Sequence, residues 1–77
     1  MKKDEIETRI AELRADRERL TGELEKARVD ERDALIRGDK PDNVAAAIVT
    51  RIAVIDDALG ELNDRLAATQ ASAQRNE

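Results

Sequence analysis

The chain has 77 residues with no cysteine, no histidine and no aromatic residue, which excludes a disulfide scaffold, a zinc site with its usual ligands and an aromatic core. Charged residues make up 42% and hydrophobic residues 40% of the chain, a balance typical of long amphipathic helices with solvated outer faces. Lys2 and Lys3 precede no apolar run, and no stretch approaches the roughly 20 apolar residues that span a bilayer. We therefore expect one all-α domain in a cytoplasmic protein without membrane contact.

The first predicted helix covers residues 4–37. Its apolar residues recur at alternating spacings of four and three, which places them on one stripe of a helix: Ile6, Ile10, Leu13, Leu20, Leu24, Ala27 and Ala34. Two positions of the same stripe are charged, Arg17 and Glu31. Acidic and basic residues alternate over the rest of the segment, so we expect a mostly solvated outer surface.

The corner of a helical hairpin is predicted over residues 38–40. Gly38 is the residue type that ends a helix in the left-handed conformation. Asp39 is suited to cap the next helix, and Pro41 fits a first turn, where a missing N–H costs nothing. Asp42 adds negative charge at the positive end of the helix dipole.

The second predicted helix covers residues 41–71, with a frayed tail at 72–77. Its stripe again alternates spacings of three and four: Ala45, Ile48, Ile52, Ile55, Leu59, Leu62 and Leu66. The β-branched residues between Ile48 and Ile55 also favour strands. The charged residues among them recur at helical intervals, which favours a helix over a strand.

The two stripes match in an antiparallel, coiled-coil-like hairpin when facing residues have numbers that sum to 79. This register pairs Leu20 with Leu59 and Leu24 with Ile55. The predicted hairpin core is Leu13, Leu20, Leu24, Ile48, Ile52, Ile55, Leu59, Leu62 and Leu66.

A single seam is a small core for a chain of this length, so we expect two hairpins to associate into a four-helix bundle. Uncharged residues repeat every seven positions outside the seam on both predicted helices and provide a surface for this contact. The candidate surface for self-association or for a protein partner is Ala15, Arg17, Gly22, Val29, Glu31, Ala46, Ala53 and Gly60.

The two charged stripe positions predict one specific contact in such a dimer. If the first helices of two chains run antiparallel about a twofold axis near Leu24, Arg17 of each chain lies level with Glu31 of the other. The alternatives within one chain are a pair between Glu31 and Arg51 and a contact between Arg17 and Glu61.

Catalytic chemistry has little support in the sequence, and we expect no enzyme, no cofactor and no metal. There is no glycine-rich phosphate loop, nucleophile elbow or metal-ligand spacing. Asp56, Asp57 and Glu61 superficially resemble an acidic metal cluster, but adjacent helical residues point about 100° apart. A solvated acidic face is the simpler interpretation.

Two function hypotheses follow from these features. The first is a non-enzymatic interaction or oligomerisation module, in an assembly, adaptor or inhibitor role, that acts through its helix faces. The alternative is a small nucleic-acid-associated regulator built on a hairpin dimer. Net charge of −4, the mixing of acids with bases and the lack of stacking aromatics all favour the first.

Overall fold

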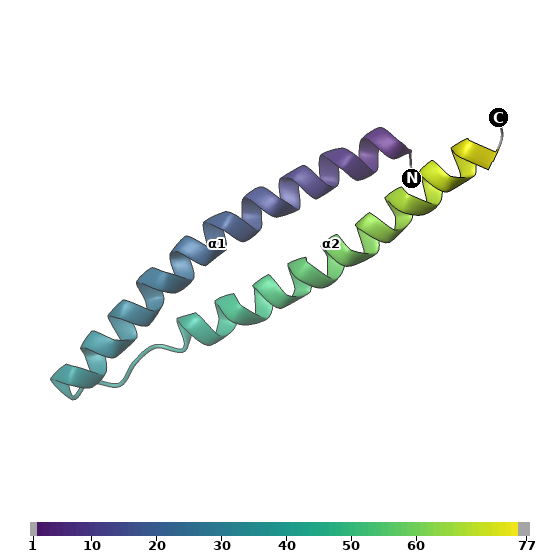
Figure 1. Cartoon of the computed structure of the whole chain (residues 1–77). Helices are drawn as coiled ribbons and strands as arrows, with labels where there is room; N and C mark the ends of the chain where they lie inside the picture. Colours follow the sequence, from purple (N-terminus) through teal and green to yellow (C-terminus); the bar gives the residue numbers. More distant parts are fainter. Residues whose placement is uncertain (1, 76–77) are drawn as a thin grey trace.

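The computed structural model describes the backbone of residues 2–75 and the side chains of residues 2–71. This part of the chain forms two helices, α1 (Lys3–Arg37) and α2 (Val44–Arg75), and it contains no strand. The helices lie antiparallel and side by side in a rod of 66 × 15 × 13 Å (Figure 1). The expectation of an all-α hairpin is confirmed.

The first helix begins without a side-chain cap. Lys2 is extended, and its carbonyl accepts the first helical hydrogen bond from the Ile6 N–H at 3.0 Å. Asp4 and Glu5 lie in the first turn, where carboxylates interact favourably with the positive end of the helix dipole. The start of α1 therefore depends on these charges and on packing of its apolar stripe.

Gly38 ends α1 as the sequence predicts. Its φ of 83° is left-handed, and its N–H donates to the Leu35 carbonyl at 3.1 Å. The Asp39 N–H donates to the Ala34 carbonyl at 2.8 Å, which completes a Schellman motif. These two bonds satisfy carbonyls that the helix end would otherwise leave without donors.

The corner is longer than predicted, and α2 begins at Val44 instead of residue 41. Asp39 does not cap α2; its carboxylate accepts a hydrogen bond from Arg37 Nε at 3.2 Å. The connection runs back beside the last turns of α1 before α2 starts (Figure 1). Pro41 is half-buried there and Ala34 is buried, so the end of α1 lies beside a non-helical connection where we expected a second helix.

The far end of α2 also differs from the prediction. The helix continues through Arg75, four residues beyond the predicted end, so the tail expected to fray from residue 72 is helical in its described part. Asn76 and Glu77 lie outside the described residues.

The seam between the helices consists of two apolar clusters. The open-end cluster contains Ile6, Ile10 and Leu62, with Leu13, Leu59 and Leu66 packed against it. The corner-side cluster contains Leu20, Ala27, Ala45 and Ile48, with Leu24, Ile52 and Ile55 packed against it. The Arg17–Asp56 pair between the helices joins residues whose numbers sum to 73. Both clusters fit the same register, in which facing residues have numbers that sum to about 72.

The observed register is therefore one heptad away from the predicted sum of 79. Leu20 and Leu59, predicted to face each other, belong to different clusters. The physical reason lies at the open end, where the predicted register would have faced Ile6 and Ile10 with Ala73 and Thr69. The observed register gives these isoleucines leucine neighbours, which buries more apolar area.

Candidate interaction surface

The nine residues predicted as hairpin core all lie in the seam. Leu20, Ile48 and Leu62 are buried, and the other six are partly buried and packed against one of the two clusters. The prediction omitted several buried members of the same stripes: Ile6, Ile10, Ala27, Ala34 and Ala45. Their four-and-three spacing was the available signal, and Ile6, with 1% exposure, is the most buried of them.

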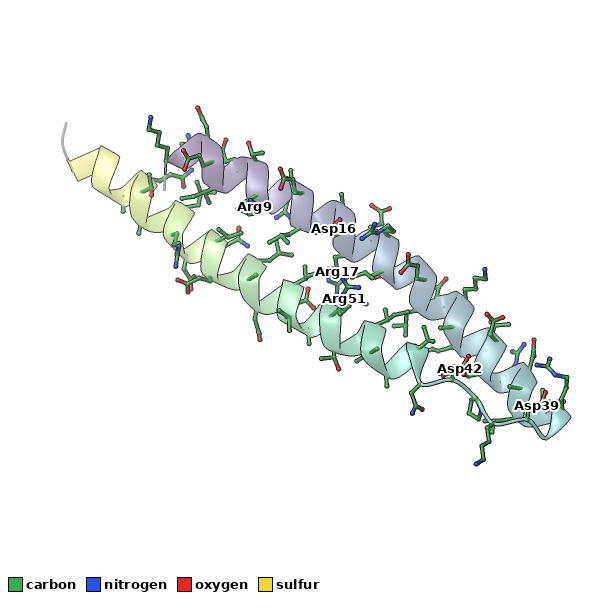
Figure 2. The ribbon with its side chains drawn as sticks, turned by 180° about the vertical axis from the view of Figure 1, so that it is seen from behind. Arg9, Asp16, Arg17, Asp39, Asp42 and Arg51 are labelled. Atoms are coloured by element: carbon green, nitrogen blue, oxygen red, sulfur yellow. The ribbon has the colours of Figure 1, made fainter. Side chains whose placement is uncertain are left out.

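Arg17 lies between the two helices, where it interrupts the apolar seam between the two clusters (Figure 2). Its guanidinium binds Asp56 on α2. Arg17 Nε donates to Asp56 Oδ1 at 2.5 Å, and a second guanidinium nitrogen donates to Oδ2 at 3.3 Å. Both side chains are close to half-exposed, at 44% and 47%. The charged position thus reaches the edge of the seam and stays hydrated, which avoids the cost of a buried charge.

The hydrogen bond between these side chains perturbs both groups. It raises the pKa of Arg17, assisted by the charge of Asp56. It lowers the pKa of Asp56, while partial burial of the carboxyl opposes that shift. The sequence did not single out this pair, because Asp56 comes level with Arg17 only in the observed register.

Glu31 contacts the beginning of α2. Its Oε1 accepts a hydrogen bond from the Ala45 N–H at 3.3 Å, and the side chain is half-buried. The first N–H groups of a helix have no partner inside the helix and carry partial positive charge. Glu31 therefore supplies from α1 the acid that the first turn of α2 lacks.

Both charged stripe positions consequently have partners within the chain. Arg17 binds Asp56 instead of Glu61, and Glu31 binds the α2 N-terminus instead of Arg51. A pair between Arg17 of one chain and Glu31 of another would have to break both contacts. The face of α1 that carries Arg17 and Glu31 also packs against α2.

The remaining candidate surface residues are exposed and form two separate groups. Ala15, Gly22 and Val29 lie on α1, whereas Ala46, Ala53 and Gly60 lie on α2. A Cβ added at Gly22 or at Gly60 would meet nothing within 4 Å. The hairpin leaves both groups open to a neighbour.

Several large aliphatic side chains also lie outside the seam. Among the described residues, those that are at least 44% exposed are Val29, Leu35, Ile36, Val44, Val49 and Val54. Ile36 is the most exposed of them, at 76%. Val29 and Ile36 are seven residues apart on the same side of α1, so they continue the row formed by Ala15 and Gly22.

A groove of about 330 Å³ lies where the corner runs beside α1, between Asp30, Ala34 and Pro41. Its acidic residues include Glu31 and Asp39, which already bind the α2 N-terminus and Arg37. No group of three or more potential metal-ligating side chains occurs in the part of the chain that the structure describes. The acidic residues Asp56, Asp57 and Glu61 do not act as one cluster. Asp56 binds Arg17, and Glu61 binds Arg65 at 3.0 Å.

Comparison with protein-family models, curated proteins and solved structures finds no match to this chain. Within the described residues, neither α1 nor α2 is long and apolar enough to cross a membrane. The geometry defines the chain as a two-helix hairpin with a seam of two apolar clusters, polar contacts made by Arg17 and Glu31, and exposed apolar residues outside the seam.

Proposed function

We propose that the hairpin is a non-enzymatic interaction module that associates with a second copy of itself, forming an assembly of four helices. The carrying observation is the set of exposed aliphatic residues on both helices beside a core that consists of one seam. Exposed apolar surface of this kind usually marks an interface. Burying it would add the second layer that a short chain needs for stability. A cytoplasmic location belongs to the same proposal.

The same surface would serve an assembly, adaptor or inhibitor role. A dimer of hairpins presents helix faces at fixed spacing, and a partner helix could bind beside the exposed valines of α2, Val49 and Val54. Binding of this type needs only apolar contact and shape, which this chain offers. It does not require histidine or cysteine, which this chain lacks.

The alternative of nucleic-acid binding has weaker support. Among the side chains that the structure describes, seven basic ones lie within 4 Å of a carboxylate: Lys3, Arg9, Arg17, Arg19, Arg32, Arg37 and Arg65. A phosphate backbone is best bound by a patch of one sign. Mixed pairs along α1 present both signs to such a ligand.

Sedimentation equilibrium over a wide concentration range tests the proposal. We expect a dimer, and a melting temperature that rises with protein concentration because association stabilises the folded chain. A monomeric mass together with a concentration-independent melting temperature would contradict self-association. A salt-sensitive shift of labelled RNA or DNA would favour the alternative.

A further inference from the structure

The apolar stripes of α1 and α2 fit each other in two alignments that differ by one heptad. In the observed register, the numbers of facing residues sum to about 72. A slide of α2 by seven residues, about 10 Å toward the corner, gives a sum of 79, and we call this alignment the slid register. It keeps large aliphatic pairs in the seam: Leu13 with Leu66, Leu20 with Leu59 and Leu24 with Ile55.

The local signals for the start of a helix at the corner fit the slid register. Residues 38–43 lie outside both helices and run back beside α1 (Figure 1). The first turn of α2, which lies wholly within the described residues, contains no acidic residue. Pro41 and Asp42 are nevertheless suited to a first turn, because proline needs no N–H partner there and a carboxylate interacts favourably with the helix dipole. In the slid register α2 lies nearer the corner, so a turn of about three residues suffices and the helix can begin at Pro41.

The packing of the open end favours the observed register. Ile6 and Ile10 belong to one cluster with Leu62. After the slide they would face Ala73 and Thr69, which bury less apolar area. The corner and the open end therefore favour different registers. Such a conflict between local signals and global packing is what a two-state element requires.

Arg17 has a hydrogen-bond acceptor in both registers. In the observed one it binds Asp56. The slide brings Asn63, one heptad further along the same edge of α2, to the place that Asp56 occupies. The amide oxygen of Asn63 can accept a hydrogen bond from the guanidinium. The Arg17 position therefore tolerates the slide.

Glu31, the other charged seam position, fits the observed register only. Its carboxylate accepts a hydrogen bond from the Ala45 N–H at the start of α2. The slide carries Ala45 about 10 Å away and places Ile48 and Val49 opposite Glu31. A carboxylate among apolar side chains loses hydration, which costs free energy. Glu31 is thus the charged seam residue that opposes the slide.

We propose that the hairpin is a two-register switch, in which α2 slides one heptad along α1 while residues 41–43 join α2, and Glu31 holds the observed register. The slide changes the separation between exposed residues of the two helices, such as Ile36 on α1 and Val54 on α2, by about 10 Å. A partner that contacts both helices binds one register in preference and shifts the hairpin toward it. The movement takes place within one chain, so it does not depend on self-association.

Pairs of introduced cysteines report the register, because the chain has no cysteine of its own. Three exposed acidic residues follow one edge of α1 at intervals of seven, and Ala58 lies on the matching edge of α2. Asp16→Cys with Ala58→Cys, the Asp16 pair, brings two thiols together in the observed register. Glu23→Cys with Ala58→Cys, the Glu23 pair, does so in the slid register. Asp30→Cys with Ala58→Cys, the Asp30 pair, is the matched control that neither register brings together.

The rate of disulfide closure within one chain is measured in dilute protein with oxidised glutathione, by the mass of the monomeric product. We expect the Asp16 pair to close fastest, and the Glu23 pair to close at least about tenfold faster than the Asp30 pair. If closure required global unfolding, the Glu23 and Asp30 pairs would close at nearly equal rates, because the entropy of loop closure changes slowly with loop length. Equal rates for these two pairs would overturn the proposal.

Glu31→Leu tests which group holds the observed register. A leucine at this position gains contact with Ile48 in the slid register, so the closure rate of the Glu23 pair relative to the Asp30 pair should rise at least about fivefold. Glu31→Gln keeps an acceptor oxygen for the Ala45 N–H and should raise this ratio less. A substitution that only destabilised the hairpin would speed both pairs alike, and an unchanged ratio would overturn the role of Glu31. Circular dichroism of each variant checks that the hairpin remains helical.

Discussion

The open end and the corner end of the seam are built in different ways. At the open end, isoleucines of α1 meet leucines of α2, and Ile6 is 1% exposed although it lies in the first turns of its helix. Toward the corner the buried residues include three alanines, Ala27, Ala34 and Ala45. There the Glu31 carboxylate also accepts a hydrogen bond from the backbone N–H of Ala45. The Arg17–Asp56 pair lies between the two regions.

This difference shows which part of the molecule sets the register. Alanines lose little contact when one helix slides past the other, because they bury little area. The large aliphatic residues lose leucine neighbours if α2 moves by one heptad. The open end therefore determines how the helices align, and the corner adapts through a longer non-helical connection that runs back along α1.

The largest expected effect comes from truncating the open-end cluster. Ile6→Ala and Leu62→Ala should each lower the free energy of unfolding by ~2–5 kcal/mol, since both side chains are buried. Chemical denaturation of each variant measures the change. Gln70→Ala, a truncation at an exposed position of α2 outside the seam, is the control and should stay within about 0.5 kcal/mol of wild type. Equal losses at all three positions would show that the open end is not packed as described.

The corner should respond most to a change of its glycine. Gly38→Ala forces a residue with a Cβ into φ of 83°, so we expect a loss of about 1–2 kcal/mol. The matched control is Gly60→Ala, in mid-helix with open space around it, which should instead stabilise by up to about 1 kcal/mol. Thermal melts at one fixed concentration report both. A stabilising Gly38→Ala would mean that the Schellman end of α1 is absent in solution.

Glu31 tests whether the corner needs its carboxylate contact. Glu31→Ala removes the acceptor for the Ala45 N–H and should cost about 0.5–1.5 kcal/mol. Glu31→Gln keeps an acceptor oxygen without the charge and should lose less. If both variants unfold like wild type in urea, α2 begins without help from α1.

The smallest effect is expected at the boundary between the two regions. The pKa of Asp56 is held below its ordinary 3.8 by Arg17, so its contribution to stability is present above pH 3.8 and is lost as the pH falls through the lowered value. Arg17, whose pKa is raised, stays charged throughout this range. The Asp56→Asn variant should therefore have a slightly lower melting temperature than wild type at pH 7. The difference between the two melting temperatures should become smaller in acid. A difference in melting temperature that stays unchanged as the pH falls well below 3.8 would assign the effect to something other than this pair.

Much of this protein can be read from its sequence. The four-and-three spacing of apolar residues predicted two helices that bury one stripe each, because local periodicity is a property of each segment alone. Gly38 predicted where α1 ends, since a left-handed residue after a helix is nearly specific to glycine. The nine predicted core residues follow from the same spacing.

The tertiary structure decided the register, and with it the partners of the charged residues. A pattern that repeats every seven residues looks the same after a shift of seven, so periodicity cannot choose between sums of 79 and 72. Only the packing of the whole seam distinguishes them, through the neighbours that Ile6 and Ile10 acquire. Once that alignment is set, Arg17 lies beside Asp56 and Glu31 lies at the start of α2, and neither contact exists in the other register.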